Sequence, residues 1–232
     1  KDRILCVGAG LTGSVIAREL AGQGLSVTVI DERAHVAGNC HSRRDPETGI
    51  MVHVYGPLIF HTSDAGVWDY VNRFSRFHPY INRIRAAVHD EVYPLPINLA
   101  TINQFFGKNF TPEEAQDFIE NVQADRGIKY PRNFEEHALR HVGRSLYEAF
   151  FKGYTLKQWE IHPRNLPAAI LQRLPVRYTA DDNYYNDTFQ GIPEDGYTVM
   201  VQRILDHPGI RLELGTRFEE IDPGGFLHVF YS

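Results

Sequence analysis

The first 31 residues alternate between apolar runs and glycine turns. Residues 4–7 form an apolar run that predicts a strand, and the turn 8–13 follows it. Apolar side chains then recur at helical spacing until Gly22 or Gly24, and a second run, Ser26–Ile30, predicts another strand. This order predicts a strand–turn–helix–strand unit, the usual beginning of a parallel sheet with helices on its faces.

The middle of the chain changes from strands to helices. An apolar segment at 51–55 predicts a strand that Gly56–Pro57 ends, and one apolar face at 67–74 predicts a helix. Residues 84–97 predict two short strands around Asp90–Glu91, and residues 98–172 predict four or five helices. Two of these helices have start signals, Thr111 with Pro112 and Glu114, and Asn133 with Glu136.

The last third returns to short strands. We predict strands at Val176–Tyr178 and Thr188–Phe189, then a helix over Tyr197–Leu205. Residues 211–214 and 228–231 predict strands that rejoin the first sheet. The chain stops directly after the last of these strands, so we expect the sequence to be part of a longer protein.

The turn at residues 8–13 has the spacing Gly-x-Gly-x-x-Gly, which is typical of dinucleotide-binding folds. Gly8 permits the tight turn, Gly10 lets the backbone approach a pyrophosphate, and Gly13 lets the helix pack closely on the strand. Asp31, at the end of the second strand, stands where a ribose hydroxyl needs an acceptor. The alternative is a strand–turn–helix whose glycines serve packing alone.

Composition narrows the class of partner. The 232 residues carry a net charge of -5 at pH 7, which disfavours a general nucleic-acid surface, and no apolar run approaches the roughly 18 residues of a membrane span. Two distant cysteines suggest no disulfide framework, and we expect a cytoplasmic protein without a signal peptide. Eleven histidines are present without ligand spacing, so we predict no metal site.

Several blocks together resemble the N-terminal part of bacterial UDP-galactopyranose mutases. The most specific are Gly-Tyr-Thr-Leu-Lys-Gln-Trp at 153–159 and Arg-Leu-Pro-Val-Arg at 173–177. The others are Val7–Gly13, Val36–Cys40, Val52–Thr62 and Asp182–Tyr185. The resemblance implies an isomerase that interconverts UDP-galactopyranose and UDP-galactofuranose through a sugar adduct at N5 of reduced FAD, with no net redox change. It also implies a homo-oligomer, a dimer or larger.

The resemblance implies an α/β fold in three parts. A discontinuous Rossmann-like FAD-binding domain would comprise residues 1–75 and 190–232. A small antiparallel sheet domain would comprise 76–97 and 173–189, and a helical domain with a mobile loop would comprise 98–172. The FAD-binding residues would be Gly8, Gly10, Leu11, Thr12, Gly13, Asp31, Glu32, Gly38, Asn39, Leu58 and Ile59.

The resemblance also assigns substrate-binding residues. Phe150 and Tyr154 would stack on the uracil ring, with Thr155 and Trp159 nearby, although aromatic residues at helical spacing also serve core packing, where we leave Tyr147 and Phe151. The remaining two residues face the diphosphate. Arg173 would bind it and serve catalysis from the mobile loop, and Tyr184 would hydrogen-bond a phosphate, whereas Arg177 would pair structurally.

Three positions depart from the family pattern. Leu58 stands where a histidine beside the flavin is usual, and Leu227 stands where an aspartate is common. Ala37 replaces a glycine, which costs backbone freedom and is tolerated only if φ is negative there. Two alternatives stay open: a truncated or degenerate homologue without turnover, and another FAD-dependent oxidase that shares only the nucleotide-binding half.

Overall fold

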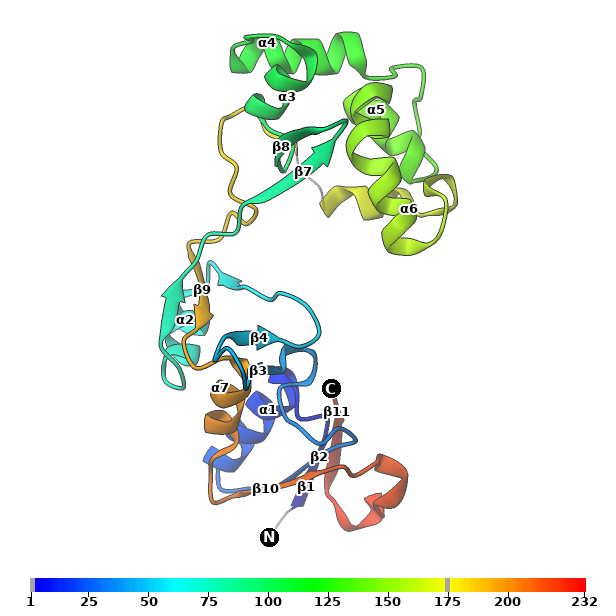
Figure 1. Cartoon of the computed structure of the whole chain (residues 1–232). Helices are drawn as coiled ribbons and strands as arrows, with labels where there is room; N and C mark the ends of the chain where they lie inside the picture. The colour runs from blue at the N-terminus through cyan, green and yellow to red at the C-terminus, as the bar shows by residue number, and fades with distance from the viewer. Residues whose placement is uncertain (1–2, 174–175) are drawn as a thin grey trace. The chain divides into compact units, whose positions relative to one another are not determined.

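The computed structural model describes residues 3–173 and 176–232, with the side chains of 171–173 outside the description. The chain divides into two compact units (Figure 1). Unit 1 comprises Lys1–Tyr80 and Asp187–Ser232, and unit 2 comprises Ile81–Asn186. Each unit has its own hydrophobic cluster, so each is described by itself.

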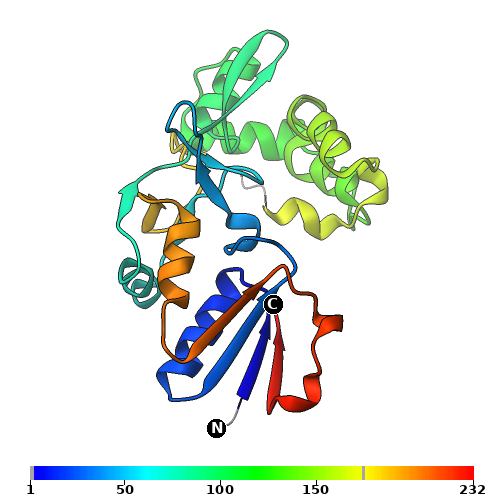
Figure 2. The ribbon, with the colours of Figure 1, turned by 60° about the horizontal axis from the view of Figure 1, so that its bottom comes forward.

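Unit 1 is built on a four-stranded sheet in the order β10-β2-β1-β11, in which every neighbouring pair is parallel. Helices α1 and α7 lie side by side on this sheet (Figure 2), and buried apolar side chains of both helices pack on β1 and β2. The strands are β1 (Arg3–Val7), β2 (Ser26–Asp31), β10 (Ile210–Leu214) and β11 (His228–Tyr231); the helices are α1 (Leu11–Gly22) and α7 (Tyr197–Leu205).

Two smaller antiparallel sheets complete unit 1. One pairs β3 (Ser42–Arg44) with β4 (Met51–His53), and the other has the order β5-β9-β6. Helix α2 packs on the second sheet, where the Trp68 ring stacks on Phe189 at a centroid distance of 5.3 Å. The remaining elements are β5 (Phe60–Thr62), α2 (Ala65–Asn72), β6 (Phe77–Pro79), β9 (Phe189–Pro193) and the 3-10 turns η1 (Gly38–Cys40), η6 (Phe218–Glu220) and η7 (Pro223–Gly225).

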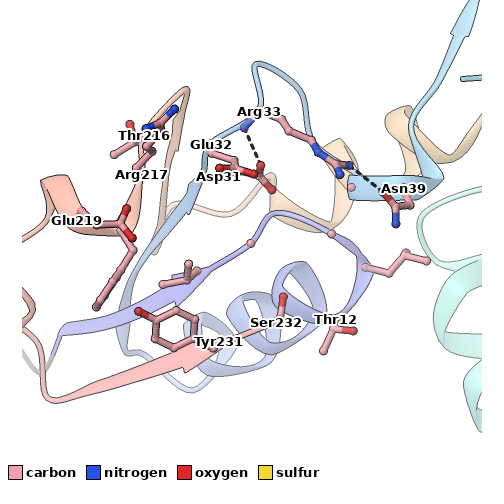
Figure 3. Close-up of a pocket in the computed structure, with 16 residues that line it drawn as sticks. Thr12, Asp31, Glu32, Arg33, Asn39, Thr216, Arg217, Glu219, Tyr231 and Ser232 are labelled. Atoms are coloured by element: carbon pink, nitrogen blue, oxygen red, sulfur yellow. Dashed lines mark hydrogen bonds between the residues drawn. The ribbon is translucent and has the colours of Figure 1, made fainter. Parts of the chain in front are cut away.

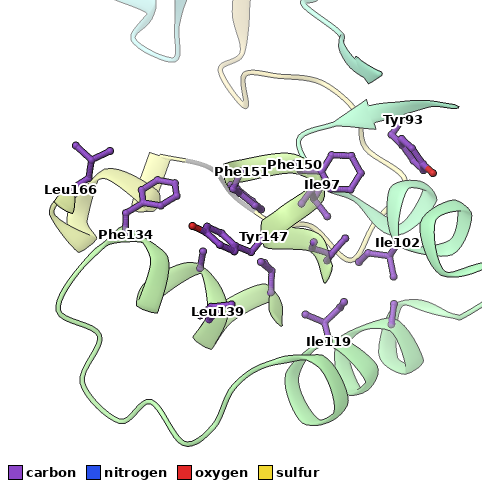
Figure 4. Close-up of a cluster of buried hydrophobic side chains, with 14 residues drawn as sticks. Tyr93, Ile97, Ile102, Ile119, Phe134, Leu139, Tyr147, Phe150, Phe151 and Leu166 are labelled. Atoms are coloured by element: carbon purple, nitrogen blue, oxygen red, sulfur yellow. The ribbon is translucent and has the colours of Figure 1, made fainter. Parts of the chain in front are cut away.

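Unit 2 packs helices against one β-hairpin, β7 (Ile84–Val88) and β8 (Glu91–Leu95). Its core joins Tyr93 of the hairpin to Phe134, Tyr147 and Phe150 of the helical region (Figure 4). The helices are α3 (Leu99–Phe106), α4 (Pro112–Asp117), α5 (Phe134–Leu146) and α6 (Gly153–Trp159), with π-helical turns η2 (Phe118–Gln123) and η3 (Tyr147–Lys152) and 3-10 turns η4 (Pro163–Asn165) and η5 (Ala168–Arg173).

Most elements confirm the sequence-based expectations, and the helix starts do so in detail. The Thr111 side chain accepts a hydrogen bond from the Glu114 amide while the Glu114 carboxylate accepts one from the Thr111 amide. Asn133 caps α5 through the Glu136 amide. The strand expected at 176–178 is wrong, because the Arg177 amide bonds to the carbonyl of Ile97, which lies past the end of β8. The three-domain division stays a prediction.

Candidate functional site

The turn between β1 and α1 contains three glycines, and the structure places a different requirement on each position. Gly8 has φ +106 and its amide donates to the Ile30 carbonyl at 2.8 Å. A Cβ on Gly13 would lie 2.0 Å from the Gly8 carbonyl oxygen, so the close approach of helix and turn excludes any side chain there. Gly10 has an ordinary φ of -74, and a Cβ on it would meet nothing within 4 Å. Neither backbone strain nor protein packing therefore requires glycine at position 10.

A pocket of about 520 Å³ lies beside the glycine turn (Figure 3), and Gly10 is one of its lining residues. The first turn of α1 forms one wall, and no side chain among the described residues caps this helix. An uncapped helix N-terminus offers N–H groups and a positive dipole end to an anion. The lining residues are Val7, Gly8, Gly10, Leu11, Thr12, Asp31, Glu32, Arg33, Gly38, Asn39, Thr216, Arg217, Phe218, Glu219, Tyr231 and Ser232.

Eight of the eleven predicted cofactor residues lie around this one pocket, and they come from the glycine turn, the end of β2 and η1. Gly13 lies beneath the turn rather than in the lining. Leu58 and Ile59 are outside the lining of this pocket. The Leu58 backbone is nevertheless fixed, because its amide donates to His53 Nδ1 at 3.0 Å and its carbonyl accepts from the Tyr197 hydroxyl at 3.4 Å.

Asp31 holds the pocket together through its carboxylate. Oδ2 accepts the Ala9 amide at 2.8 Å, and Oδ1 accepts the Arg33 amide at 2.9 Å. The acid at the end of β2 thus ties the glycine turn to the loop that follows β2. Glu32 beside it lines the same pocket, and the binding of a ribose by Asp31 stays a prediction.

The loop from Arg33 to His41 closes one side of the pocket. The Arg33 guanidinium donates to Asn39 Oδ1 at 3.0 Å and lies over the Tyr55 ring, 4.9 Å from its centroid. The His35 and His41 rings stack with centroids 3.8 Å apart. Burial, with His35 and Arg43 nearby, lowers the pKa of His41, so this histidine is kept neutral in the folded state.

In unit 2, the residues predicted for the uracil ring lie on η3 and α6. Phe150 is buried in the core, in edge-on contact with Tyr93 and Phe105. Tyr154 and Trp159 are 60% and 48% exposed, whereas Thr155 is buried. The exposed rings are available to a planar base, whereas Phe150 is largely covered by the core of unit 2. Tyr147 and Phe151 are buried core residues, as expected.

The two residues predicted to contact the diphosphate are described to different extents. Tyr184 is half-buried, its amide donates to the Asn82 carbonyl at 2.8 Å, and its ring lies edge-on to Tyr185. The Arg173 backbone ends η5, but its side chain lies outside the described residues. The contacts of both residues with a diphosphate stay predictions.

Known proteins resemble this chain over most of its length. Residues 149–232 match the family model of UDP-galactopyranose mutase, and residues 6–74 match that of the NAD(P)-binding Rossmann-like domain. A probable UDP-galactopyranose mutase of Klebsiella pneumoniae is 54% identical over 99% of this chain and 59% of its own length. A dTDP-fucopyranose mutase of Escherichia coli is 46% identical over 100% of this chain and 63% of its own length.

The chain belongs to the UDP-galactopyranose mutase and dTDP-fucopyranose mutase family. It spans about three-fifths of the length of these two relatives. A crystal structure of reduced UDP-galactopyranose mutase superposes with a TM-score of 0.69 over 92% of this chain and 48% of that chain, at 18% identity. The expected α/β Rossmann-like fold with added helices and small antiparallel sheets is therefore confirmed.

One departure from the mutase family pattern has a structural cost. Ala37 has φ +75, so the condition for an alanine at no cost, a negative φ, is not met. Its amide donates to the Ala9 carbonyl at 2.8 Å and its side chain is buried, which holds it in the left-handed region. That conformation costs a residue with a Cβ roughly 1–2 kcal/mol. The chain therefore keeps, with an alanine, a loop conformation that a glycine would adopt freely.

Sequence reasoning missed the pocket residues that follow β10 and β11. Thr216, Arg217, Phe218 and Glu219 line the pocket, and Tyr231 packs edge-on against Phe218. Burial and the nearby Glu219 raise the pKa of Tyr231. Only the expectation that both strands rejoin the first sheet could have pointed to these residues, because parallel strands end at one edge.

Two features are absent from the described ranges, 3–173 and 176–232. No cluster of three or more histidine, cysteine or acidic side chains there could hold a metal ion. No helix there has the length and apolar character needed to cross a membrane.

Proposed function

We propose that this chain supplies the FAD-binding and nucleotide-binding parts of an isomerase that interconverts UDP-galactopyranose and UDP-galactofuranose. The proposal is supported by the 54% identity to the Klebsiella pneumoniae relative. Because the chain covers 59% of that relative, the activity is proposed for the protein of which this sequence is the matching part. A homo-oligomeric state and a cytoplasmic location remain predictions from the resemblance.

The residues of unit 1 fit FAD. The observation that carries this is the space beside Gly10, which a Cβ would occupy without touching protein, next to an uncapped helix N-terminus. A pyrophosphate placed there would accept the N–H groups of the first turn of α1. Arg33 and Arg217 stand in the same lining, together with the acids Asp31, Glu32 and Glu219, so the positive end for a pyrophosphate is the N-terminus of α1 rather than the net charge of the lining.

Bound reduced FAD would supply the nucleophile for the anomeric carbon of the sugar, and the protein would supply position and charge. Phe150 and Tyr154 would bind the uracil ring, with Thr155 and Trp159 nearby, and of these four side chains Tyr154 and Trp159 are the exposed ones. Arg173 would stabilise the negative charge on the departing diphosphate, and Tyr184 would donate a hydrogen bond to it. No described side chain is required to form a covalent bond.

The test is an anaerobic assay with UDP-galactofuranose, FAD and dithionite. Conversion to UDP-galactopyranose only when the flavin is reduced supports the proposal. No conversion with either flavin state in a full-length protein containing this chain contradicts it and favours a homologue without turnover. Reduction of the flavin by an amine or another reductant substrate, without isomerisation, favours the oxidase alternative.

A second substrate has a specific observation in its favour. The Escherichia coli relative is a dTDP-fucopyranose mutase and is 46% identical to this chain. dTDP-fucose differs from UDP-galactose at the base and at the sugar, so one competition assay with both nucleotide sugars separates the candidates. We expect a higher kcat/KM for UDP-galactofuranose than for the dTDP sugar. The reverse preference would make the dTDP sugar the proposed substrate.

A further inference from the structure

Loop 181–186 of unit 2 carries Tyr184 and is held by arginine side chains from two directions. On one side, Arg177 reaches the loop backbone and Asn186. On the other side, Arg83 and Arg85 both bind the Asp182 carboxylate. A six-residue loop with this many charged contacts is more restrained than its lack of regular secondary structure suggests.

We propose that Arg177 is a positioning residue: its guanidinium fixes loop 181–186 so that Tyr184 is presented in one orientation to the diphosphate of the nucleotide sugar. The inference rests on the proposed function, which assigns Tyr184 to a phosphate. It gives Arg177 a role distinct from that of Arg173, in which contact with the substrate is direct.

The contacts of Arg177 are directed at the loop. Its Nη1 donates to the Asn183 carbonyl and, at 3.4 Å, to the Asp181 carbonyl, and its Nη2 donates to Asn186 Oδ1 at 2.6 Å. The Asp181 carboxylate lies 3.7 Å from Nη1. These acceptors stand on both sides of Tyr184 in the sequence, so one planar group ties the two ends of the loop together.

The burial of Arg177 argues against a direct contact between its side chain and a phosphate. Its side chain is only 11% exposed, and its backbone amide donates to the Ile97 carbonyl at 2.9 Å. A guanidinium covered in this way, with both terminal nitrogens engaged by the loop, has little surface left for a ligand. Its effect on a bound diphosphate would pass through the loop that it holds.

Asp182 secures the opposite side of the loop. Its carboxylate accepts Arg83 Nε at 2.9 Å and Arg85 Nη2 at 2.8 Å. The hydrogen bonds from Arg85 and Arg83 lower the pKa of Asp182, which favours its ionised form. Arg83 and Arg85 are two residues apart on extended chain leading into β7, which places both side chains on one face.

Between these anchors, Tyr184 is held by one backbone hydrogen bond and one ring contact. Its amide donates to the Asn82 carbonyl at 2.8 Å, and its ring meets Tyr185 edge-on at 4.9 Å. A tyrosine already fixed in its bound orientation loses less conformational freedom when it binds. Lysine at position 177 would keep the charge but could not bridge several acceptors in one plane.

The experiment compares the wild-type chain with Arg177→Lys, Tyr184→Phe and the double variant. UDP binding is measured by calorimetric titration, and 3-fluorotyrosine labelling reports the state of Tyr184 by ¹⁹F NMR. The Tyr184→Phe spectrum identifies the Tyr184 resonance among the 12 tyrosines. Arg132→Lys is the matched control, because Arg132 forms an exposed pair with Glu136 in the same unit.

We expect Arg177→Lys to weaken UDP binding by about tenfold, the factor for one charge-assisted hydrogen bond, and to move the Tyr184 resonance towards that of free tyrosine. Tyr184→Phe should show a similar loss, and the double variant should lose no more than Tyr184→Phe alone. Arg132→Lys should change neither measurement. Losses that add in the double variant, or an unmoved Tyr184 resonance, overturn the inference.

Two further outcomes remain decisive. If the wild-type chain does not bind UDP, the proposed nucleotide-sugar function of this chain is contradicted, and the Tyr184 resonance alone decides whether Arg177 positions the loop. If Arg177→Lys lowers the thermal unfolding midpoint, Asn186→Ala replaces it, since this change removes one acceptor of the guanidinium. An unmoved Tyr184 resonance in Asn186→Ala then overturns the inference.

Discussion

At the scale of single residues, Ala37 occupies a backbone conformation that suits glycine. Its φ of +75 costs roughly 1–2 kcal/mol. Replacement by glycine removes this cost, but it also removes a buried methyl worth about 0.8 kcal/mol and adds about 0.4–1 kcal/mol of unfolded-state entropy. We therefore expect Ala37→Gly to change the free energy of unfolding by less than about 1 kcal/mol.

The control is Ala17→Gly, at a fully buried position in α1. There the native φ gives glycine no advantage, and we expect a loss of about 2 kcal/mol from helix propensity and the buried methyl together. Urea denaturation of both variants measures the contrast. Equal losses in the two variants would contradict the left-handed conformation of Ala37.

Gly10 and Gly13 allow stability to be separated from cofactor binding. Gly10→Ala places a methyl in open pocket space at an allowed φ, so stability should stay equal or rise by about 0.4–1 kcal/mol, while FAD affinity falls at least about tenfold. Gly13→Ala places a Cβ 2.0 Å from the Gly8 carbonyl oxygen, and we expect a loss of about 3 kcal/mol or more. Urea denaturation and flavin fluorescence titration measure the two effects.

A Gly10→Ala variant that binds FAD as tightly as the wild type would place the pyrophosphate elsewhere.

Gly8, Gly13 and Ala37 show how much of the backbone geometry can be predicted from the sequence. The spacing of the glycine motif correctly predicts a tight turn at Gly8 and close packing at Gly13. It does not reveal the positive φ of Ala37, because that angle is imposed by the hydrogen bond from the Ala37 amide to the Ala9 carbonyl and by burial in the tertiary structure.

At the scale of elements, His41 in the pocket loop and His53 in β4 make the free energy of unfolding depend on pH. Burial lowers the pKa of His41 and of His53, and the repulsion by His35 and Arg43 adds to the effect at His41. His41 Nδ1 faces the Thr198 hydroxyl at 2.9 Å, and His53 Nδ1 accepts the Leu58 amide at 3.0 Å. Both contacts suit a neutral ring, and protonation of His53 Nδ1 breaks the bond from Leu58.

The sign of the pH dependence follows from these lowered values. The unfolded chain binds protons at a pKa of about 6.5, above the folded pKa of both histidines. Between the two values the unfolded state holds more protons, so the free energy of unfolding should fall as the pH drops below about 6.5. Urea denaturation across this range should show a shallower slope for His41→Gln and a still shallower one for the double variant with His53→Gln.

Retention of the full slope in the double variant would assign the pH dependence to other groups.

Elements that depend on local sequence were predicted correctly, whereas one that depends on a distant partner was not. The helix at Tyr197–Leu205 and the strand at 228–231 follow from local periodicity. The strand expected at 176–178 has the right residue types but no partner strand, and its place is set by Ile97 and loop 181–186. Periodicity carries no information on such long-range partners.

At the scale of the whole molecule, the chain enters and leaves unit 2 through neighbouring segments. The Tyr80 amide donates to the Gln190 carbonyl at 3.4 Å on the side of unit 1. The Tyr184 amide donates to the Asn82 carbonyl at 2.8 Å on the side of unit 2. Unit 2 is therefore a continuous insertion whose two ends are held close together, an arrangement that domain insertions require.

The division into two units also limits what the sequence can predict about the substrate residues. The cofactor residues are close in sequence to one turn and one strand end, so a single motif predicts their meeting. Phe150, Tyr154 and Tyr184 belong to a unit whose helices are packed by a separate core, and their spacing alone predicts core packing as readily as base stacking. Phe150 shows the point, since it is buried at 9% exposure.

The two-unit organisation predicts that residues 81–186 fold alone. Their hydrophobic cluster draws its members from within this segment, from Ala86 of the hairpin to Tyr178, and the bond between Tyr184 and Asn82 closes the ends. We expect the isolated segment to unfold cooperatively in urea, with helical circular dichroism. We also expect unit 1, with Tyr80 joined to Asp187 by a short Gly-Ser linker, to unfold cooperatively and bind FAD.

These experiments test whether FAD binding needs unit 1 alone or both units. If each half folds alone and unit 1 binds FAD, the nucleotide pocket needs no residue of unit 2, because every residue that lines it belongs to unit 1. A segment 81–186 that stays unfolded would mean that its core depends on unit 1. A unit 1 variant that folds but loses FAD would show that cofactor binding draws on unit 2, and Gly10→Ala in that background would test whether the remaining affinity still involves the glycine turn.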